Sequence, residues 1–183
     1  MIHDLPLGPA LRRHRRLNGI KQAHLAELLG ISQGTVSRWE SGAHQPDPSL
    51  RAKIARVVAA RTESHGDAAL KRLVSESRSD VHLVCDATHR LLAASATRAA
   101  SWRGGVADRL GVSLWPYATP EIVAAEEGLR DRGWFEGVFQ TLCFETGPNG
   151  SPEVPVPPSV VRWETVPLAD GRVGRLTTTV RPA

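Results

Sequence analysis

The densest group of side chains suited to molecular recognition lies between Lys21 and His44. Ile31, Val36 and Trp39 share one face of an expected helix, which should enter a core because helical neighbours recur every three to four residues. The outer side of that helix then presents a short polar row: Gln33, Gly34, Thr35, Ser37 and Arg38. An amide can form two hydrogen bonds with adenine and a guanidinium two with guanine, each pair contributing roughly 1–3 kcal/mol of discrimination. These residue types are therefore suited to reading the edges of base pairs.

The distribution of charge also indicates a polyanionic partner. The 183 residues carry 23 Lys and Arg against 19 Asp and Glu, a formal net charge of +4. Residues 1–62 hold ten basic and four acidic side chains, a balance of +6, whereas residues 63–183 hold thirteen and fifteen, a balance of −2. The whole excess lies in the first third of the chain. A basic segment followed by a slightly acidic one favours a polyanion-binding domain joined to a domain with another role.

Several protein classes are excluded by composition. Hydrophobic residues make up 41% of the chain, and no apolar run approaches the roughly 20 residues that span a bilayer. The N-terminus becomes basic after a few apolar residues, unlike a secretory signal. Two cysteines, Cys85 and Cys143, are too few for a disulfide framework. We expect a cytoplasmic protein with no membrane partner.

The first third of the sequence predicts an all-α domain, residues 1–60, with four to five helices. Helices are expected over residues 10–18, 21–30 and 32–42, and a fourth follows Asp47. Gly30 can adopt the positive φ of a tight turn between helices. Ser32 is typical of a helix N-cap. Ala26 is small enough to let two helices cross closely.

The stretch from Lys21 to Pro46 resembles the helix-turn-helix of the xenobiotic-response-element (XRE) family, the phage repressor and Cro type. The matching positions are Gln22, Leu25-Ala26, Gly30-Ile31-Ser32, Val36-Ser37, Trp39-Glu40, Gly42 and Pro46. The resemblance covers roughly residues 11–58. It implies binding to double-stranded DNA, with the N-terminal end of the second helix of the pair in the major groove.

The resemblance assigns roles to individual residues. Gln33 and Arg38 are expected on base edges, Thr35 and Ser37 on bases or phosphates, and Gln22 on a phosphate. Gly34 departs from the longer polar residue often found at its position, so fewer side chains would read bases. The expected DNA-contacting set is Gln22, Ser32, Gln33, Gly34, Thr35, Ser37, Arg38, Arg12, Lys21 and His44, with Arg13 and Arg16 as further phosphate candidates. Arg15 and Glu40 match a structural ion pair of the family.

Residues 61–80 are polar, but Leu70, Leu73 and Val74 recur at helical spacing. Two interpretations stay open for this segment: a solvated linker, or a connecting helix that pairs with its copy in a dimer.

Residues 81–183 predict an α+β domain with a five-stranded antiparallel sheet. Residues 81–95 form a hairpin pattern, residues 119–132 an amphipathic helix, and three strand-like runs follow Gly133. This order, two strands, a helical middle and three strands, resembles a PAS-type sensory domain. Such domains bind a small molecule, a cofactor or a protein partner in the cup between sheet and helices.

Other residues that could do chemistry have simpler interpretations. His82, Cys85 and His89 suggest metal ligands by type, but strand residues three apart point to opposite faces, so no metal site is expected. Cys143 lies in an apolar strand and is expected to be a buried core thiol. Most of the tryptophans are expected in a core rather than around a pocket: Trp102, Trp115, Trp134 and Trp163. No catalytic motif and no cofactor motif is present.

The sequence therefore predicts a DNA-binding transcriptional regulator, more a repressor than an activator, that acts as a homodimer on a palindromic operator. No resident cofactor is expected, and the C-terminal domain could take a small-molecule or protein effector. Two rivals stay open. One is an antitoxin or anti-activator whose C-terminal domain grips a protein; the other is an enzyme with a DNA-binding head, which a fully apolar cup would exclude.

Overall fold

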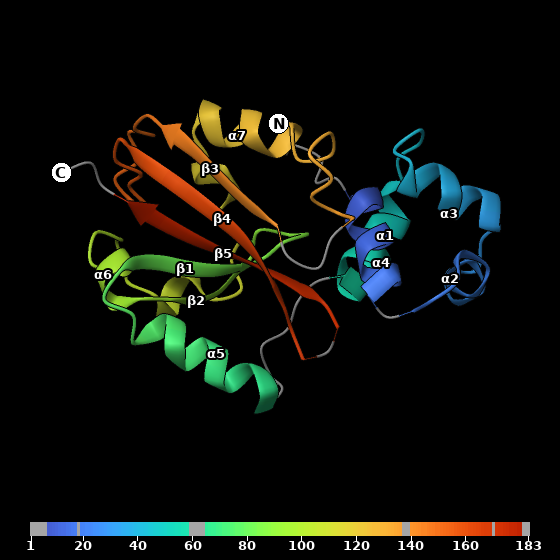
Figure 1. The fold of residues 1–183 in the computed structure, drawn as a ribbon, viewed down its shortest axis with the longest axis horizontal. Coiled ribbons are helices and arrows are strands. Elements are labelled where there is room, and N and C mark those ends of the chain that lie inside the picture. The colour runs from blue at the N-terminus through green and yellow to red at the C-terminus, as the bar shows by residue number, and fades with distance from the viewer. Residues whose placement is uncertain (1–6, 18, 59–64, 137–139, 170, 181–183) are drawn as a thin grey trace.

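The computed structural model describes residues 7–17, 19–58, 65–136, 140–169 and 171–180. Two parts are distinguished below: the helical head, residues 7–58, and the sheet body, residues 65–180. Figure 1 shows the four helices of the head at one end of the molecule and the sheet with its helices at the other.

The head consists of α1 (Leu7–Leu17), α2 (Gln22–Leu29), α3 (Gln33–Glu40) and α4 (Pro48–Val58). The predicted stop and start signals are in place. Gly30 ends α2 with φ 71°, the Ser32 side chain accepts a hydrogen bond from the Thr35 amide, and Asp47 accepts one from the Leu50 amide. Local sequence thus determines where α2 ends and where α3 and α4 begin.

The core of the head depends on a close approach between α1 and α3. Leu11, Leu25, Val36 and Ile54 are buried in it. At Gly8, a Cβ atom would lie 1.9 Å from the main-chain oxygen of Trp39. The absent side chain of Gly8 therefore lets α1 lie directly against the C-terminal end of α3.

The body is built on one antiparallel sheet with the strand order β2-β1-β5-β4-β3. Its strands are β1 (Asp80–Cys85), β2 (Leu91–Ala94), β3 (Thr141–Thr146), β4 (Ser159–Pro167) and β5 (Val173–Val180). β1 and β2 form the predicted hairpin, and the last strand, β5, pairs with β1. The first and last strands of the body therefore lie side by side at the centre of the sheet.

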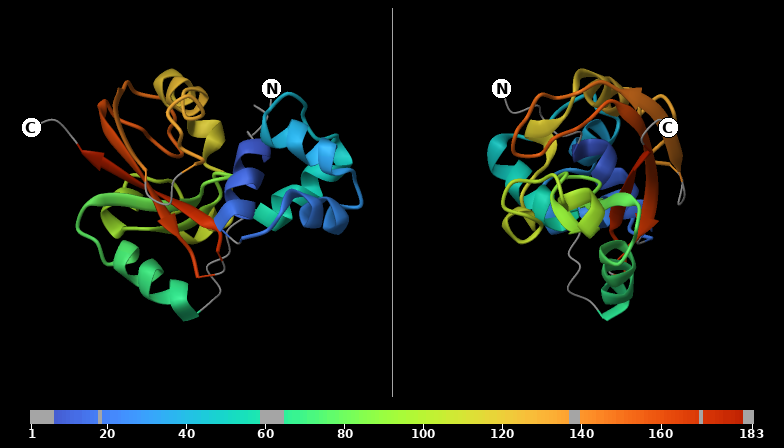
Figure 2. Two further views of the ribbon diagram at one scale, coloured as in Figure 1. Left: turned by 45° about the vertical axis from the view of Figure 1, so that its right-hand side comes forward. Right: turned by 90° about the vertical axis from the view of Figure 1, so that its left-hand side faces the viewer.

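Both faces of the sheet are covered. On one face, Val81, Leu83 and Cys85 belong to an apolar cluster that includes Val74 and Leu70 of α5 (His65–Ser75). On the other, Val84 packs with Trp102 and Val154. This second face is covered by α6 (Ala96–Ala99), by two 3₁₀ turns at Ala107–Arg109 and Trp115–Tyr117, and by α7 (Pro120–Glu127). Figure 2 shows α5 and α7 at opposite ends of the body.

Three expectations about the body are corrected. The helix predicted through residue 132 ends at Glu127. The strand predicted from Trp134 begins only at Thr141, because Trp134 and Phe135 are buried in a cluster against residues of β4 instead of lying in the sheet. Cys143 is exposed, because β3 is an edge strand on which alternate side chains face water.

The segment predicted as a linker or a dimer helix, residues 61–80, contains α5, and its residues 61–64 lie outside the described residues. Val74 of α5 is buried, whereas Leu73 is 66% exposed. The helix therefore packs on the body through one side and presents an exposed leucine on another.

Head and body are in contact. Leu7 and Leu11 of α1 belong to the same continuous apolar cluster as Leu83 and Ala87 of the body. Figure 1 shows α1 and α4 between the sheet and α3, which lies on the far side of the head. No helix among the described residues has the length and apolar character to cross a membrane.

We expect Gly8→Ala to lower the free energy of unfolding by about 1–3 kcal/mol, because the added methyl group forces α1 away from Trp39. Urea denaturation followed by tryptophan fluorescence measures this loss. Gly34→Ala is the matched control, since the nearest atom to a Cβ there is 3.8 Å away; it should leave stability unchanged or raise it. Equal losses in the two variants would contradict the proposed close approach.

Candidate nucleic-acid interface

The outer side of α3 carries the polar row predicted from the sequence. Gln33 and Arg38 are exposed, and Gly34, Thr35 and Ser37 are half-buried. Ser32 and Thr35 share a hydrogen bond of 2.8 Å between their hydroxyl oxygens, and Arg38 Nη2 donates to Thr35 Oγ1 at 3.4 Å. The structure therefore brings these five predicted residues and Ser32 together on one accessible surface.

A chain of hydrogen bonds fixes α2 against this surface. Arg15 Nε and Nη2 donate to the two carboxylate oxygens of Glu40 at 2.7 and 2.9 Å, and this hydrogen bonding raises the pKa of Arg15. Gln22 Nε2 donates to Glu40 Oε2 at 2.8 Å, and Gln33 Nε2 donates to Gln22 Oε1 at 2.7 Å. The buried Glu40 carboxylate thus orients Gln22, which in turn holds Gln33 at the start of α3.

Two of the predicted phosphate-contacting residues flank α3. The three basic residues of α1 that were also predicted to contact phosphates lie against carboxylates of the body instead. Lys21, the residue before α2, and His44, in the segment after α3, are both exposed. Arg12 and Arg16 lie 3.0 and 3.7 Å from the Glu136 carboxylate of the body. The structure therefore does not bring Arg12 together with the α3 residues.

Arg13 corrects the expectation that it is a phosphate candidate. Its side chain is 2% exposed, and its Nη1 lies 3.4 Å from Asp86 Oδ2 of the body. Burial lowers the pKa of Arg13, and the Asp86 charge opposes that shift. A guanidinium in this position is not accessible to DNA phosphates in this arrangement.

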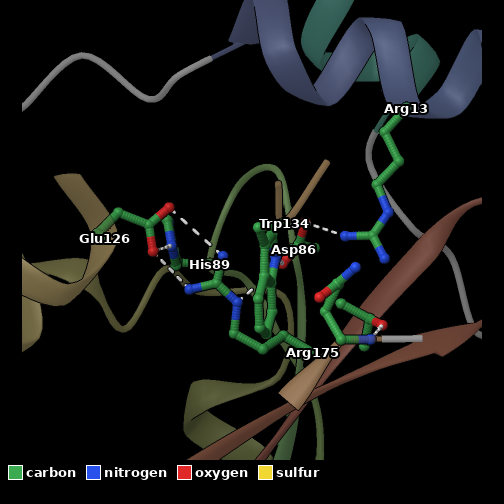
Figure 3. Close-up of polar contacts among 8 residues, drawn as sticks. Arg13, Asp86, His89, Glu126, Trp134 and Arg175 are labelled. Atoms are coloured by element: carbon green, nitrogen blue, oxygen red, sulfur yellow. Dashed lines mark hydrogen bonds and ion pairs between the residues drawn. The ribbon is translucent and has the colours of Figure 1, made fainter. Parts of the chain in front are cut away.

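Asp86 opens a buried ion network that the sequence did not reveal (Figure 3). Arg175 Nε and Trp134 Nε1 both donate to Asp86 Oδ1, at 2.8 and 3.1 Å. Arg175 also donates Nη1 and Nη2 to the Glu126 carboxylate, and His89 Nε2 lies 3.3 Å from Glu126 Oε2. The network thus runs from α1 of the head, through the body, to the turn between β1 and β2.

The network is electrostatically balanced. Burial alone would raise the pKa of Glu126, but the charge of Arg175 and the contacts with His89 lower it to about 2. Burial disfavours the charged form of Arg175, yet Glu126 and Asp86 together raise its pKa. Two guanidiniums, Arg13 and Arg175, therefore oppose two carboxylates, which is the condition for burying such charges.

The sequence held one signal for this network. Asp86 follows the apolar run 81–85, and Arg175 lies in the strand-like run 172–180. Charged residues in buried strands require partners of opposite charge. Which residues pair is not visible in the sequence, because the bonded partners of Arg175 lie 49 and 89 positions away.

A cavity of about 80 Å³ adjoins the network on the face of the sheet that carries His82. His82, His89, Arg98 and Arg175 line it, together with apolar and aromatic residues that include Trp115 and Trp163. Two of the four tryptophans expected in a core thus face a cavity, and the cup is not fully apolar.

Cys85 is fully buried in the cluster on the other face. Among the described residues, no group of three potential ligands could hold a metal ion.

We expect Asp86→Asn to lower the free energy of unfolding by about 3 kcal/mol or more, because it leaves Arg13 and Arg175 buried with one carboxylate between them. Denaturation in urea at neutral pH measures the loss. Glu136→Gln removes a carboxylate from the same side of the body, but one that is 52% exposed, so its effect should stay within about 0.5 kcal/mol. A loss at Asp86 no larger than that at Glu136 would show that the buried network contributes little.

Comparison with known proteins agrees with the geometry of the head. A helix-turn-helix family model matches residues 11–58, about a quarter of the chain. No curated protein and no solved structure matches the chain significantly. The matched segment is similar to helix-turn-helix domains of the XRE type, which supports a DNA-binding transcription regulator.

Proposed function

We propose that this protein is a sequence-specific DNA-binding transcription regulator that uses α3 as its recognition helix. The observation that carries the proposal is the accessible polar row of α3, held in place by the Arg15–Glu40–Gln22–Gln33 hydrogen bonds within the segment that matches the helix-turn-helix family. The N-terminal part of such a helix enters the major groove.

The proposed contacts follow from the chemistry of this surface. Gln33 and Arg38 read base edges, Thr35 and Ser37 contact bases or phosphates, and Gly34 lets the backbone approach the DNA closely. Gln22, Lys21, Ser32 and His44 bind phosphates at the edges of the surface. Arg12 joins this set only when it leaves Glu136.

We further propose that the protein acts as a homodimer on a palindromic operator, with repression as its effect. One short α3 offers few base-reading side chains, and two copies on half-sites about 34 Å apart supply the affinity typical of operators. The exposed Leu73 of α5 is the apolar side chain that we assign to the dimer contact, on the element predicted to pair.

The body is proposed to be a PAS-like sensory domain. Its element order, two strands, a helical segment and three strands around one antiparallel sheet, supports this assignment. The cavity of about 80 Å³ favours a small-molecule effector over the protein partner of an antitoxin, because a protein partner binds over a broad surface and not in a small cup. The alternative of an enzyme with a DNA-binding head is not excluded, because polar as well as apolar residues line the cavity.

Selection of genomic DNA fragments on the purified full-length protein tests the proposed function. We expect enrichment of one inverted repeat whose half-sites are about one helical turn apart. Recovery of fragments without a common sequence would overturn sequence-specific binding.

On the recovered operator, Arg38→Ala should weaken specific binding by about tenfold or more, because a base-reading guanidinium is lost, and weaken binding to random DNA much less. Fluorescence anisotropy with both DNAs measures the two effects. Arg162→Ala is the matched control: it removes the same charge from β4, where Arg162 pairs with Glu164. Equal losses on operator and random DNA would show that Arg38 does not read bases.

Light scattering at micromolar concentration should give about twice the chain mass of 19.8 kDa. Leu73→Glu should lower this mass toward that of one chain, because it places a charge in the proposed α5 contact. Leu110→Glu changes another exposed leucine, in the segment that bridges to Leu91 of β2, and should leave the mass unchanged. A full-length protein with the mass of one chain would overturn the dimer proposal.

A further inference from the structure

The segment that follows α7, residues 128–136, brings the body against the head. Its last residue, Glu136, lies 3.0 Å from Arg12 and 3.7 Å from Arg16 of α1. Figure 1 shows the segment between α7 and α1. Side chains of this segment are therefore within reach of the helices of the head.

The backbone of the segment is anchored on the body. Leu129 and Trp134 are 0% and 2% exposed, in an apolar cluster with Trp163 of β4. The Trp134 amide donates to the Leu129 carbonyl at 3.0 Å, and the Gly133 amide donates to the Arg130 carbonyl at 3.0 Å. Arg130 thus extends from a turn whose position is fixed by burial of the residues around it.

The guanidinium of Arg130 lies on the main chain that follows α3. A Cβ atom at Gly42 would be 2.5 and 2.6 Å from the two terminal nitrogens of Arg130 and 2.8 Å from its Cζ. Gly42 is the second residue after Glu40, the last residue of α3. Because glycine has no side chain, the guanidinium can rest directly on the backbone at the C-terminal end of the proposed recognition helix.

This position adjoins the surface that we assign to DNA. His44, two residues beyond Gly42, is exposed and belongs to the proposed phosphate contacts. The His44 amide donates to the Arg38 carbonyl at 3.1 Å, so the segment after α3 folds back toward the helix that carries Arg38. Two residues span at most about 7 Å, and successive phosphates of one DNA strand are ~3.4 Å apart along the axis. A strand that passes His44 therefore has a further phosphate near Arg130.

Arg130 is available to bind that phosphate. Its side chain is exposed, and no hydrogen bond or ion pair joins it to the part of the chain that the structure describes. The arginines of α1 differ, since Arg12, Arg13 and Arg16 each lie beside a carboxylate of the body. Docking of α1 thus occupies three positive charges of the head and places another one beside α3. The exposed run 130–132 holds two arginines and one aspartate, a balance of +1.

We propose that Arg130 is a DNA-binding residue of the body, which contacts a backbone phosphate of the operator that α3 reads while the head is docked. The inference rests on the proposed function, because it needs α3 to lie on DNA. The partner is a phosphate and not a base, since the C-terminal end of a recognition helix lies away from the N-terminal residues that contact base edges. Arg130 therefore adds affinity and fixes orientation, and it adds no sequence preference.

This contact couples DNA binding to the arrangement of head and body. Arg130 reaches the end of α3 only while α1 lies against the body through Arg13, Asp86 and the shared apolar cluster. DNA that binds Arg130 therefore stabilises the docked head, and the docked head binds DNA more tightly by the same factor. A change in docking alters operator affinity through Arg130 without any movement within α3.

Binding of the full-length protein to operator and random DNA between about 50 and 200 mM salt tests the contact, with fluorescence anisotropy as the readout. Arg130→Gln should weaken binding to both DNAs severalfold at the lower salt concentration. It should also reduce the slope of log affinity against log salt by about 1 for each chain bound, because one phosphate contact is lost. Arg130→Lys should retain most of the affinity and of the slope.

Arg132→Gln is the matched control. Arg132 is exposed like Arg130, but its Nε is 3.7 Å from the Cβ position of Gly128, the residue that ends α7. Its guanidinium therefore lies over the end of α7 instead of the end of α3, and its loss should leave the slope nearly unchanged. Equal changes of slope in the two variants, or no change in Arg130→Gln, would overturn the proposal.

A purely structural role of Arg130 gives a different result. A cation at the C-terminal end of a helix is stabilising, so a role confined to α3 would lower the urea midpoint of Arg130→Gln and leave the salt slope as it was. We expect an unchanged midpoint, measured by tryptophan fluorescence. A lowered midpoint with an unchanged slope would assign Arg130 to the fold and contradict its contact with DNA.

Tethered cleavage locates the body on the DNA. An iron–EDTA label on Arg130→Cys in a Cys143→Ser protein should cut each half-site at a few defined positions, whereas the same label on Arg162→Cys should not. Cys85 is fully buried and escapes labelling. Specific operator binding with neither cleavage from position 130 nor a changed slope would overturn the contact and leave the regulator proposal standing. Absence of DNA binding by the wild-type protein would overturn both.

Discussion

The fold of the body depends on one buried guanidinium. Arg175 is 1% exposed and lies 5.3 and 4.4 Å from the ring centres of Trp134 and Trp163. Removing such a charge from water is unfavourable by several kcal/mol unless counter-charges and hydrogen bonds replace the water. Asp86 and Glu126 supply them from the β1–β2 turn and from α7. One side chain of β5 thereby ties together two other segments of the chain, and neither of them can move without exposing or unpairing a charge.

The same carboxylate that orders the sheet also orders the head. Asp86 gives one oxygen to Arg175 and the other to Arg13 of α1, so α1 is turned toward the body and α3 faces away from it. This arrangement changes the meaning of the +6 charge of residues 1–62. Arg12, Arg13 and Arg16 contact carboxylates of the body, so the positive charge available to DNA is smaller than the composition indicates. Recognition then rests more on the few side chains of α3 than on a broad basic surface.

Local features of the fold were predictable from sequence because local physics determines them. The Ser32 cap, the left-handed Gly30 and the β1–β2 hairpin each depend on residues within a few positions of one another. The buried network was not predictable, since Asp86 and Arg175 are 89 residues apart and either one alone is typical of a turn or a surface strand. Trp134 shows the same limit: its apolar run is typical of a strand, but its indole is needed beside Arg175, and this tertiary contact overrides the local pattern. The prediction that Cys143 is buried was wrong because an apolar run does not reveal that its strand lies at the edge of the sheet.

The contacts between head and body differ in how they respond to solvent. Arg12 and Arg16 reach Glu136 at the surface, where salt screens the attraction and each pair contributes little. Arg13 and Asp86 are 2% and 3% exposed, so mobile ions screen them far less. The adjoining apolar cluster, which runs from Leu11 to Leu83, is also insensitive to moderate salt. The position of the head is therefore controlled by burial and by the charge balance around Asp86.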